Sequence, residues 1–164
     1  MHQTKKGNQY YFGMKAHIGA DMELGLVHHI HGTAANVADV AEVAELLHGE
    51  ENTVYADAGY TGVDKRDEHA GRDVIWQIAV RRSSYMTLPK RCLIYKGKRR
   101  IERAKAQTRA KVKHPFRVIK RQFGYVKTRF RGLMKNTAQL STLFVLSNLW
   151  MTRKQLMGLG ELRV

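Results

Sequence analysis

The distribution of charge constrains this chain more than any other feature of its sequence. Of its 29 Lys and Arg residues, twenty lie between positions 81 and 135, where Glu102 is the single acid. Residues 1–80 are acidic instead, with six basic and twelve acidic side chains. A basic run of this density repels itself unless counterions or a polyanion neutralise it, so it favours a nucleic-acid partner whose binding weakens as salt rises. A solvated basic face or an acidic lipid surface is the alternative explanation.

Composition excludes several other classes of protein. With 43% apolar residues and two prolines among 164 residues, the chain can bury a core, which excludes collagen-like and wholly disordered classes. Its one cysteine, Cys92, excludes a disulfide framework and a cysteine zinc site, and no neighbouring group predicts a reactive thiol. No apolar run approaches the roughly 20 residues that a membrane helix needs. We therefore expect a soluble intracellular protein.

The first half of the chain predicts an α/β arrangement with a mixed sheet. Residues 10–19 and 26–31 are rich in aromatic and β-branched types and flank a turn, which predicts a β-hairpin. Apolar residues at helical spacing predict an amphipathic helix over 39–47. Strands are predicted over 53–57 and 74–80.

The second half predicts helices. Apolar residues recur every three or four positions from Ile101 to Leu133, and Pro115 should kink this helix or start a new one. A further apolar helix over 140–150 is expected to join the core or an oligomer contact, and residues 83–98 are predicted to form a loop between the halves. Four aromatic residues among the basic ones are predicted to fill the core rather than to stack on bases: Phe116, Phe123, Tyr125 and Phe130.

Asp57 is the strongest single candidate for chemistry. It ends a predicted strand and precedes a Gly-containing turn over 58–62, where a carboxylate can hold a hard cation such as Mg²⁺. Starting that turn is the alternative role. His28, His29 and His31 resemble a metal cluster, but only the last two share a strand face and no carboxylate or Cys stands at ligand spacing. We predict these histidines to be surface or partly buried residues.

Longer stretches of the sequence resemble a known family. The strings YYFGMKAHIGAD, GTAANVADV, VYADAGYTG, HPFRVIKRQFGYVKTRFRGLMKN and TAQL…LSNLWM are similar to DDE transposases of bacterial insertion sequences, of the insertion-sequence-five type, from residue 1 to about residue 156. The resemblance implies an RNase H-like mixed sheet flanked by helices. It also implies an enzyme that cuts and joins DNA with two divalent ions, Mg²⁺ or Mn²⁺, held by three carboxylates.

The same resemblance implies partners and a location. The partners are DNA, as element ends and target, and a homo-oligomer or a mixed oligomer with an intact transposase. No membrane partner is implied, and the expected location is the bacterial cytoplasm, at the nucleoid. Charge alone suggests a structural RNA-binding protein of the ribosomal kind as another class.

The family's catalytic residues transfer only in part. Asp57 in ADAGYTG matches the second catalytic Asp. In the Y-x₂-R-x₃-E-x₆-K signature Arg109 and Lys120 are kept, but Ala106 takes the tyrosine position and Lys113 the glutamate position.

The consequence for metal binding follows from elementary electrostatics. Two like unit charges about 4 Å apart repel each other by about 4 kcal/mol at an effective dielectric constant near 20. A dication beside a lysine carries two unit charges, so its repulsion energy is roughly twice as large. The first catalytic Asp and the DNA-end-binding region would both precede Met1. The resemblance therefore predicts a catalytically impaired enzyme or, as the alternative, a non-catalytic DNA-binding remnant that interferes with an intact transposase.

The predicted architecture is an α/β fold with an incomplete RNase H-like mixed sheet, lacking the first catalytic strand, followed by basic and apolar helices. A partial catalytic domain over 1–156 comprises a sheet half (1–80), a basic helical half (81–135) and an apolar helix (136–156), before a tail (157–164). Without the missing strand, the strands near Tyr10 and before Asp57 must pair directly or leave backbone groups unpaired. The predicted DNA-binding residues are Lys111, Arg117, Lys120, Arg121, Lys127, Arg129 and Arg131.

Overall fold

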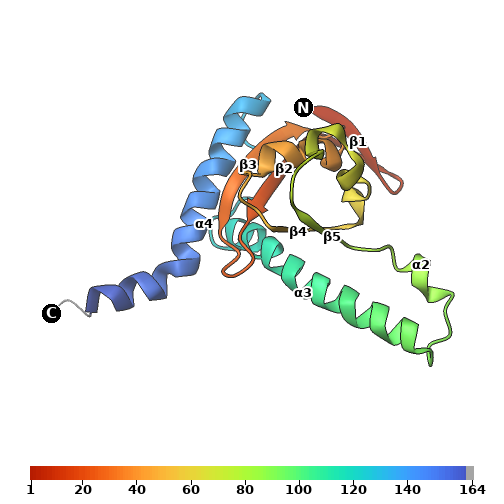
Figure 1. The fold of residues 1–164 in the computed structure, drawn as a ribbon. Helices are drawn as coiled ribbons and strands as arrows, with labels where there is room; N and C mark the ends of the chain where they lie inside the picture. Colours follow the sequence, from red (N-terminus) through yellow and green to blue (C-terminus); the bar gives the residue numbers. More distant parts are fainter. Residues whose placement is uncertain (162–164) are drawn as a thin grey trace. The chain divides into compact units, whose positions relative to one another are not determined.

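The computed structural model describes residues 1–161 and combines helices with small sheets, which confirms the α/β class (Figure 1). These residues form two compact units. Unit 1 comprises Met1–Val37 and the chain from Val112 onward, and unit 2 comprises Ala38–Lys111. The boundary at residues 111 and 112 falls inside helix α3 (Leu93–Arg121). Within the described residues, no helix has the length and apolar character needed to cross a bilayer.

Unit 1 is built on a three-stranded antiparallel sheet in the order β1 (His2–Lys6), β2 (Gln9–Ala20), β3 (Val27–Ala34). The first part of β2 pairs with β1 and the second part with β3. The turn between β2 and β3 closes on Asp21, whose carboxylate accepts the N–H groups of Leu24 and Leu26, each at 2.6 Å. The predicted hairpin is therefore confirmed.

Helix α4 (Leu133–Glu161) packs against β3 and β2 and completes the core of unit 1 (Figure 1). Phe116 and Phe144 meet edge to face with ring centroids 5.2 Å apart, a favourable arrangement for two aromatic rings. Four buried side chains form the centre of this core: Val27, Ile119, Leu140 and Phe144.

Two asparagines of α4 bond to backbone groups that lie outside this helix. The Asn148 amide accepts the N–H of Val27 at 2.9 Å and donates to the Val27 carbonyl at 2.7 Å, so it occupies the edge of β3 like a short strand. The fully buried Asn136 donates to the carbonyls of Phe130 and Gly132 at 2.7 and 2.6 Å, which holds the chain that leads into α4. Such bonds make the helix a specific partner of the sheet.

Unit 2 contains a two-stranded parallel sheet of β4 (Thr53–Ala56) and β5 (Ile75–Ile78). The connection between the strands consists of three 3₁₀ turns, η2 (Ala58–Tyr60), η3 (Val63–Lys65) and η4 (Asp67–His69). Val63 is fully buried, and the His69 ring packs on Trp76 at 5.1 Å between centroids. Burial lowers the pKa of His69, so this ring packs in its neutral form.

The strands form two separate sheets, and the prediction of one mixed sheet is wrong. β2 hydrogen-bonds to β1 and β3, and β4 to β5, so β2 and β4 do not pair. Strand β1 was not predicted, because HQTKK lacks the apolar alternation of a half-buried strand. It folds back on β2 through a turn in which Gly7 has a φ of 63°, a conformation that glycine adopts without steric cost.

The predicted helices exist with different bounds. The segment 39–47 forms a 3₁₀ turn, η1 (Asp39–Glu42), and a single α-helical turn, α1 (Val43–Leu46). The predicted loop over 83–98 is wrong, since it contains α2 (Ser83–Met86) and the start of α3.

The long apolar stripe of the second half spans more than one element. Helix α3 continues through the buried Pro115, so no new helix starts there, and it ends at Arg121 rather than near Leu133. Gly124 and Gly132 adopt positive φ angles of 63° and 84° in the segment before α4. Helix α4 is longer than the predicted 140–150 and includes the first part of the predicted tail, whose residues 162–164 lie outside the described chain.

We expect Asn148→Leu to lower the free energy of unfolding of unit 1 by about 2 kcal/mol, because both backbone groups of the buried Val27 lose their partner. Urea denaturation followed by far-UV circular dichroism measures the change. The matched control is Gln155→Leu at an exposed position of the same helix, with an expected change within about 0.5 kcal/mol. Equal effects of the two substitutions would contradict the assigned role of Asn148.

Candidate functional site

Asp57 lies directly after β4, at the carboxyl end of the parallel sheet of unit 2, and its side chain is exposed. The neighbouring strand β5 reaches the same edge, where the Ala79 N–H donates to the Ala56 carbonyl at 2.9 Å. Ligand sites of parallel α/β sheets form at this edge because the loops beyond the strand ends leave a crevice there. The position therefore suits a functional carboxylate.

The turn after Asp57 depends on the same carboxylate. Asp57 Oδ1 accepts the Gly59 N–H at 2.7 Å and begins η2, so its predicted alternative role in the turn is confirmed. A Cβ on Gly59 would lie 2.9 Å from Asp57 Oδ1, closer than side-chain atoms tolerate. Glycine at position 59 thus lets the backbone approach the Asp57 carboxylate. The second carboxylate oxygen, Asp57 Oδ2, remains available for other contacts.

A second carboxylate approaches the same turn. Asp39 Oδ2 lies 3.9 Å from the Cβ position of Gly59, and the charges of Asp39 and Asp57 both act on the Tyr60 hydroxyl. Burial, and then these two charges, raises the pKa of Tyr60 to about 12, so the phenol stays protonated at neutral pH. Sequence analysis missed Asp39, since no local spacing connects η1 to the turn after β4.

The described residues do not supply the donor set of a three-carboxylate metal site. Among residues 1–161, no group of three or more His, Cys, Asp or Glu side chains is placed to hold a metal ion. Asp39 and Asp57 are two hard oxygen donors, and nothing in this part of the chain adds the third. Cys92 is a free, half-buried thiol.

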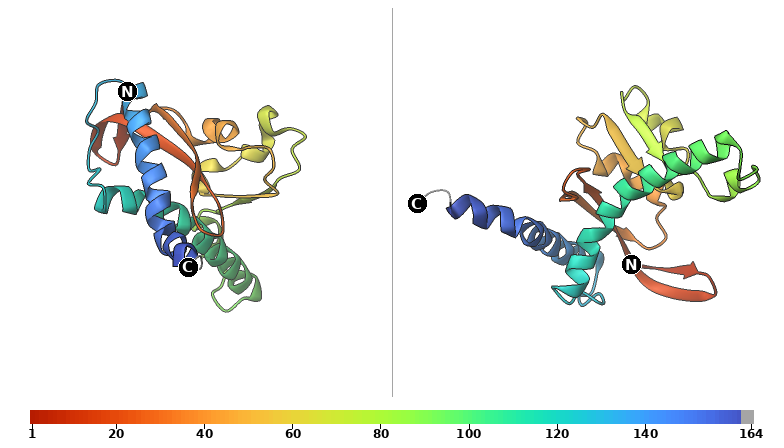
Figure 2. Two further views of the ribbon diagram at one scale, coloured as in Figure 1. Left: turned by 90° about the vertical axis from the view of Figure 1, so that its left-hand side faces the viewer. Right: turned by 90° about the horizontal axis from the view of Figure 1, so that it is seen from below.

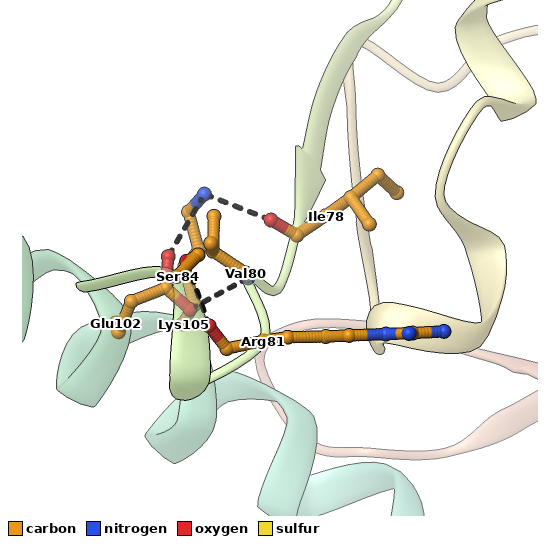
Figure 3. Close-up of polar contacts among 6 residues, drawn as sticks. All are labelled: Ile78, Val80, Arg81, Ser84, Glu102 and Lys105. Atoms are coloured by element: carbon orange, nitrogen blue, oxygen red, sulfur yellow. Dashed lines mark hydrogen bonds and ion pairs between the residues drawn. The ribbon is translucent and has the colours of Figure 1, made fainter. Parts of the chain in front are cut away.

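Glu102, the one acid of the basic block, binds to the end of β5 (Figure 3). Glu102 Oε2 accepts the Val80 N–H at 3.0 Å, and its other oxygen lies 3.5 Å from the Lys105 ammonium. Lys105 in turn donates to the Ile78 carbonyl at 3.0 Å. These largely buried side chains attach the first half of α3 to the sheet, so Glu102 has a structural task.

The family signature residues lie along α3. Arg109 belongs to the same unit as Asp57 and is half-buried, and its Nε atom has no hydrogen-bond partner within the described chain. Lys113 and Lys120 are exposed and belong to unit 1. Within unit 2 the structure places Asp39 at the turn of Asp57.

The basic residues predicted to contact DNA are all exposed: Lys111, Arg117, Lys120, Arg121, Lys127, Arg129 and Arg131. The aromatic residues between them mostly pack inward. Phe116, Phe123 and Tyr125 contact the core of unit 1, as predicted, and burial raises the pKa of Tyr125. Phe130 is 48% exposed, so the prediction that it fills the core is wrong.

Comparison with known proteins gives one family. The model of the transposase DDE domain matches residues 1–149, a span that includes both sheets, Asp57 and the whole of α3. No solved structure matches the chain.

We expect Asp57→Asn to lower the pKa of Tyr60 from about 12, because the substitution removes one of the negative charges that disfavour the phenolate. NMR titration of ¹³Cζ-labelled tyrosine measures this, and Tyr60→Phe assigns the signal. The control Asp64→Asn removes an exposed carboxylate of η3 and should leave that pKa unchanged. An unchanged pKa in Asp57→Asn would contradict the described geometry.

Proposed function

Since the chain belongs to the transposase DDE-domain family, we propose that it is a transposase of the insertion-sequence-five type with an RNase H-like origin. In this proposal the protein keeps its affinity for DNA but is impaired in metal-dependent cutting and joining of DNA. Of the three carboxylates that the family uses to hold metal ions, Asp57 is the one that this chain keeps. One observation carries this proposal. Helix α3 contains a single acidic residue, Glu102, and its carboxylate is bound at the end of β5.

Impairment follows from the donor set. A two-metal site needs several carboxylates to neutralise and fix two dications. The described residues offer Asp57 with Asp39 near it, while the signature glutamate is replaced by Lys113. A lysine ammonium repels a dication and donates rather than accepts hydrogen bonds, so Lys113 cannot substitute for the lost ligand.

Retained DNA affinity is supported by the exposed cations of residues 111–131. Lys127, Arg129 and Arg131 lie in the segment between α3 and α4, where the chain is held by Asn136 rather than by regular secondary structure. Phosphate contacts of this kind fix a protein on DNA without reading its sequence. Each phosphate that is neutralised releases counterions, which makes the affinity fall with salt.

A non-catalytic remnant that interferes with an intact transposase is the second candidate. Neighbouring exposed apolar side chains of α4 favour it, among them Val145 at 58% and Leu149 at 53% exposure one helical turn apart, because such clusters mark contact surfaces. The two candidates differ in one result: only the second predicts that an intact transposase loses strand-transfer activity when this chain is added.

We expect the triple variant Lys127→Gln, Arg129→Gln, Arg131→Gln to bind duplex DNA more weakly. It should also reduce the slope of log affinity against log salt by up to about three, since each lost phosphate contact removes about 0.9 from that slope. Fluorescence anisotropy over a salt series measures both.

The matched control removes the same charge from the acidic half of the chain: Lys65→Gln, Arg66→Gln and Arg72→Gln. We expect it to bind duplex DNA like the unmodified protein. If the two triple variants weaken binding equally, net charge rather than the segment before α4 determines affinity, and the proposed surface is refuted.

The proposed impairment predicts that the purified chain leaves a supercoiled plasmid intact in Mg²⁺ or Mn²⁺, as judged by gel electrophoresis. Asp57→Ala and the control Asp64→Ala should be indistinguishable from the unmodified chain. Metal-dependent nicking that disappears in Asp57→Ala and persists in Asp64→Ala would show that another carboxylate completes the site, and would contradict the proposal.

A further inference from the structure

The hairpin of β1 and the start of β2 carries large apolar rings into solvent. Figure 2 shows it extending away from the remainder of the three-stranded sheet. Tyr10 is 64% exposed and Phe12 75% exposed, although both belong to a regular strand. Exposed aromatic residues side by side on a regular element mark a binding surface more often than isolated ones do.

The register of the hairpin gives this surface a defined composition. Lys5 lies opposite Tyr10 and Gln3 opposite Phe12, so these four residues share one face, called here the aromatic face. The Lys5 ammonium lies 5.5 Å from the centre of the Tyr10 ring, within cation–π range. Tyr11 is on the opposite face of the same strand.

The spacing of the two rings matches that of stacked bases. Residues two apart on a strand are separated by about 6.8 Å, which is twice the rise of about 3.4 Å between successive bases of a strand. The separation of the two residues is therefore wide enough to admit one flat base between their rings. A lysine and a glutamine at the edge of such a stack offer a phosphate contact and a hydrogen-bonding amide.

The charge around this face favours a polyanion. Lys5 places a positive charge within this face, and residues 1–20 contain no Asp or Glu, although the first half of the chain is acidic overall. Such a surface attracts a phosphate backbone and repels no part of it. An apolar protein partner would need no cation beside the rings.

We propose that the aromatic face of the β1–β2 hairpin stacks on unpaired DNA bases. This inference rests on the proposed DNA-binding function and adds a preference for exposed bases, such as those of a frayed or single-stranded end. In an intact duplex each base face is already covered by its neighbours, so aromatic rings gain contacts only where bases are unstacked.

The test compares a fluorescently labelled single-stranded oligonucleotide with a duplex of the same sequence by anisotropy at one salt concentration. The double variant Tyr10→Ala, Phe12→Ala should bind the single strand about 100-fold more weakly, about tenfold for each ring, and the duplex within about twofold of the unmodified chain. The matched control is Tyr11→Ala on the opposite face, which should retain single-strand binding.

A second double variant, Tyr10→Leu, Phe12→Leu, keeps apolar side chains without a flat ring and should lose single-strand binding like the alanine pair. It also keeps the test decisive if the alanine pair does not fold. Three outcomes would overturn the stacking proposal: the leucine pair binds the single strand as well as the unmodified chain does, the double variants lose as much affinity for the duplex as for the single strand, or Tyr11→Ala loses as much single-strand affinity as they do. None of these outcomes would contradict duplex binding by the unmodified chain. Failure of the unmodified chain to bind either nucleic acid would overturn both proposals.

Discussion

The contact between Glu102 and the end of β5 is the interaction on which the arrangement of unit 2 depends. Helix α3 carries a dense set of cations and a single acid, Glu102, which lies at this contact. Glu102 accepts the Val80 N–H, and Lys105 beside it donates to the Ile78 carbonyl. One acid and one base thus neutralise each other while they occupy the backbone groups at the strand end. Other basic residues of α3, such as Arg99 and Arg103, are exposed.

This attachment also bears on chemistry. The carboxyl end of the parallel sheet holds Asp57 in a turn with Asp39 and Tyr60 near it, which is a suitable place for a metal-dependent site. Under the proposed function, the helix that the family resemblance expects to add a third carboxylate has one acid, and that acid bonds to Val80 and pairs with Lys105.

In unit 1 the helix α4 substitutes for strand pairing. Asn148 bonds both polar backbone groups of Val27, and Phe144 packs edge to face on Phe116 of α3. The sheet therefore has a covered face and a free hairpin, the one formed by β1 and the start of β2. Packing explains the covered face, whereas the rings of the hairpin are exposed and carry the proposed stacking on DNA bases.

Local signals in the sequence predicted part of this fold. The hairpin around Asp21 and the turn after Asp57 were found because turn residues and alternation act within a few positions. The end of α3 at Arg121 was missed because Phe123 and Val126 keep the helical spacing although both lie in an irregular segment. Asp39 was missed because its approach to Asp57 depends on chain folding over a long separation. The division into two sheets likewise depends on which strands find partners, and no local pattern records this.

The proposed function places Asp57 in an incomplete carboxylate set. Titration of the ¹⁵N-labelled chain with Mn²⁺ tests this most directly, because a bound paramagnetic ion broadens the amide signals of residues around Asp57 in a saturable way. We predict no saturable broadening at Gly59 and Tyr60, either in the unmodified chain or in Asp57→Asn. Saturable broadening there that Asp57→Asn abolishes would demonstrate a competent metal site and contradict the proposal.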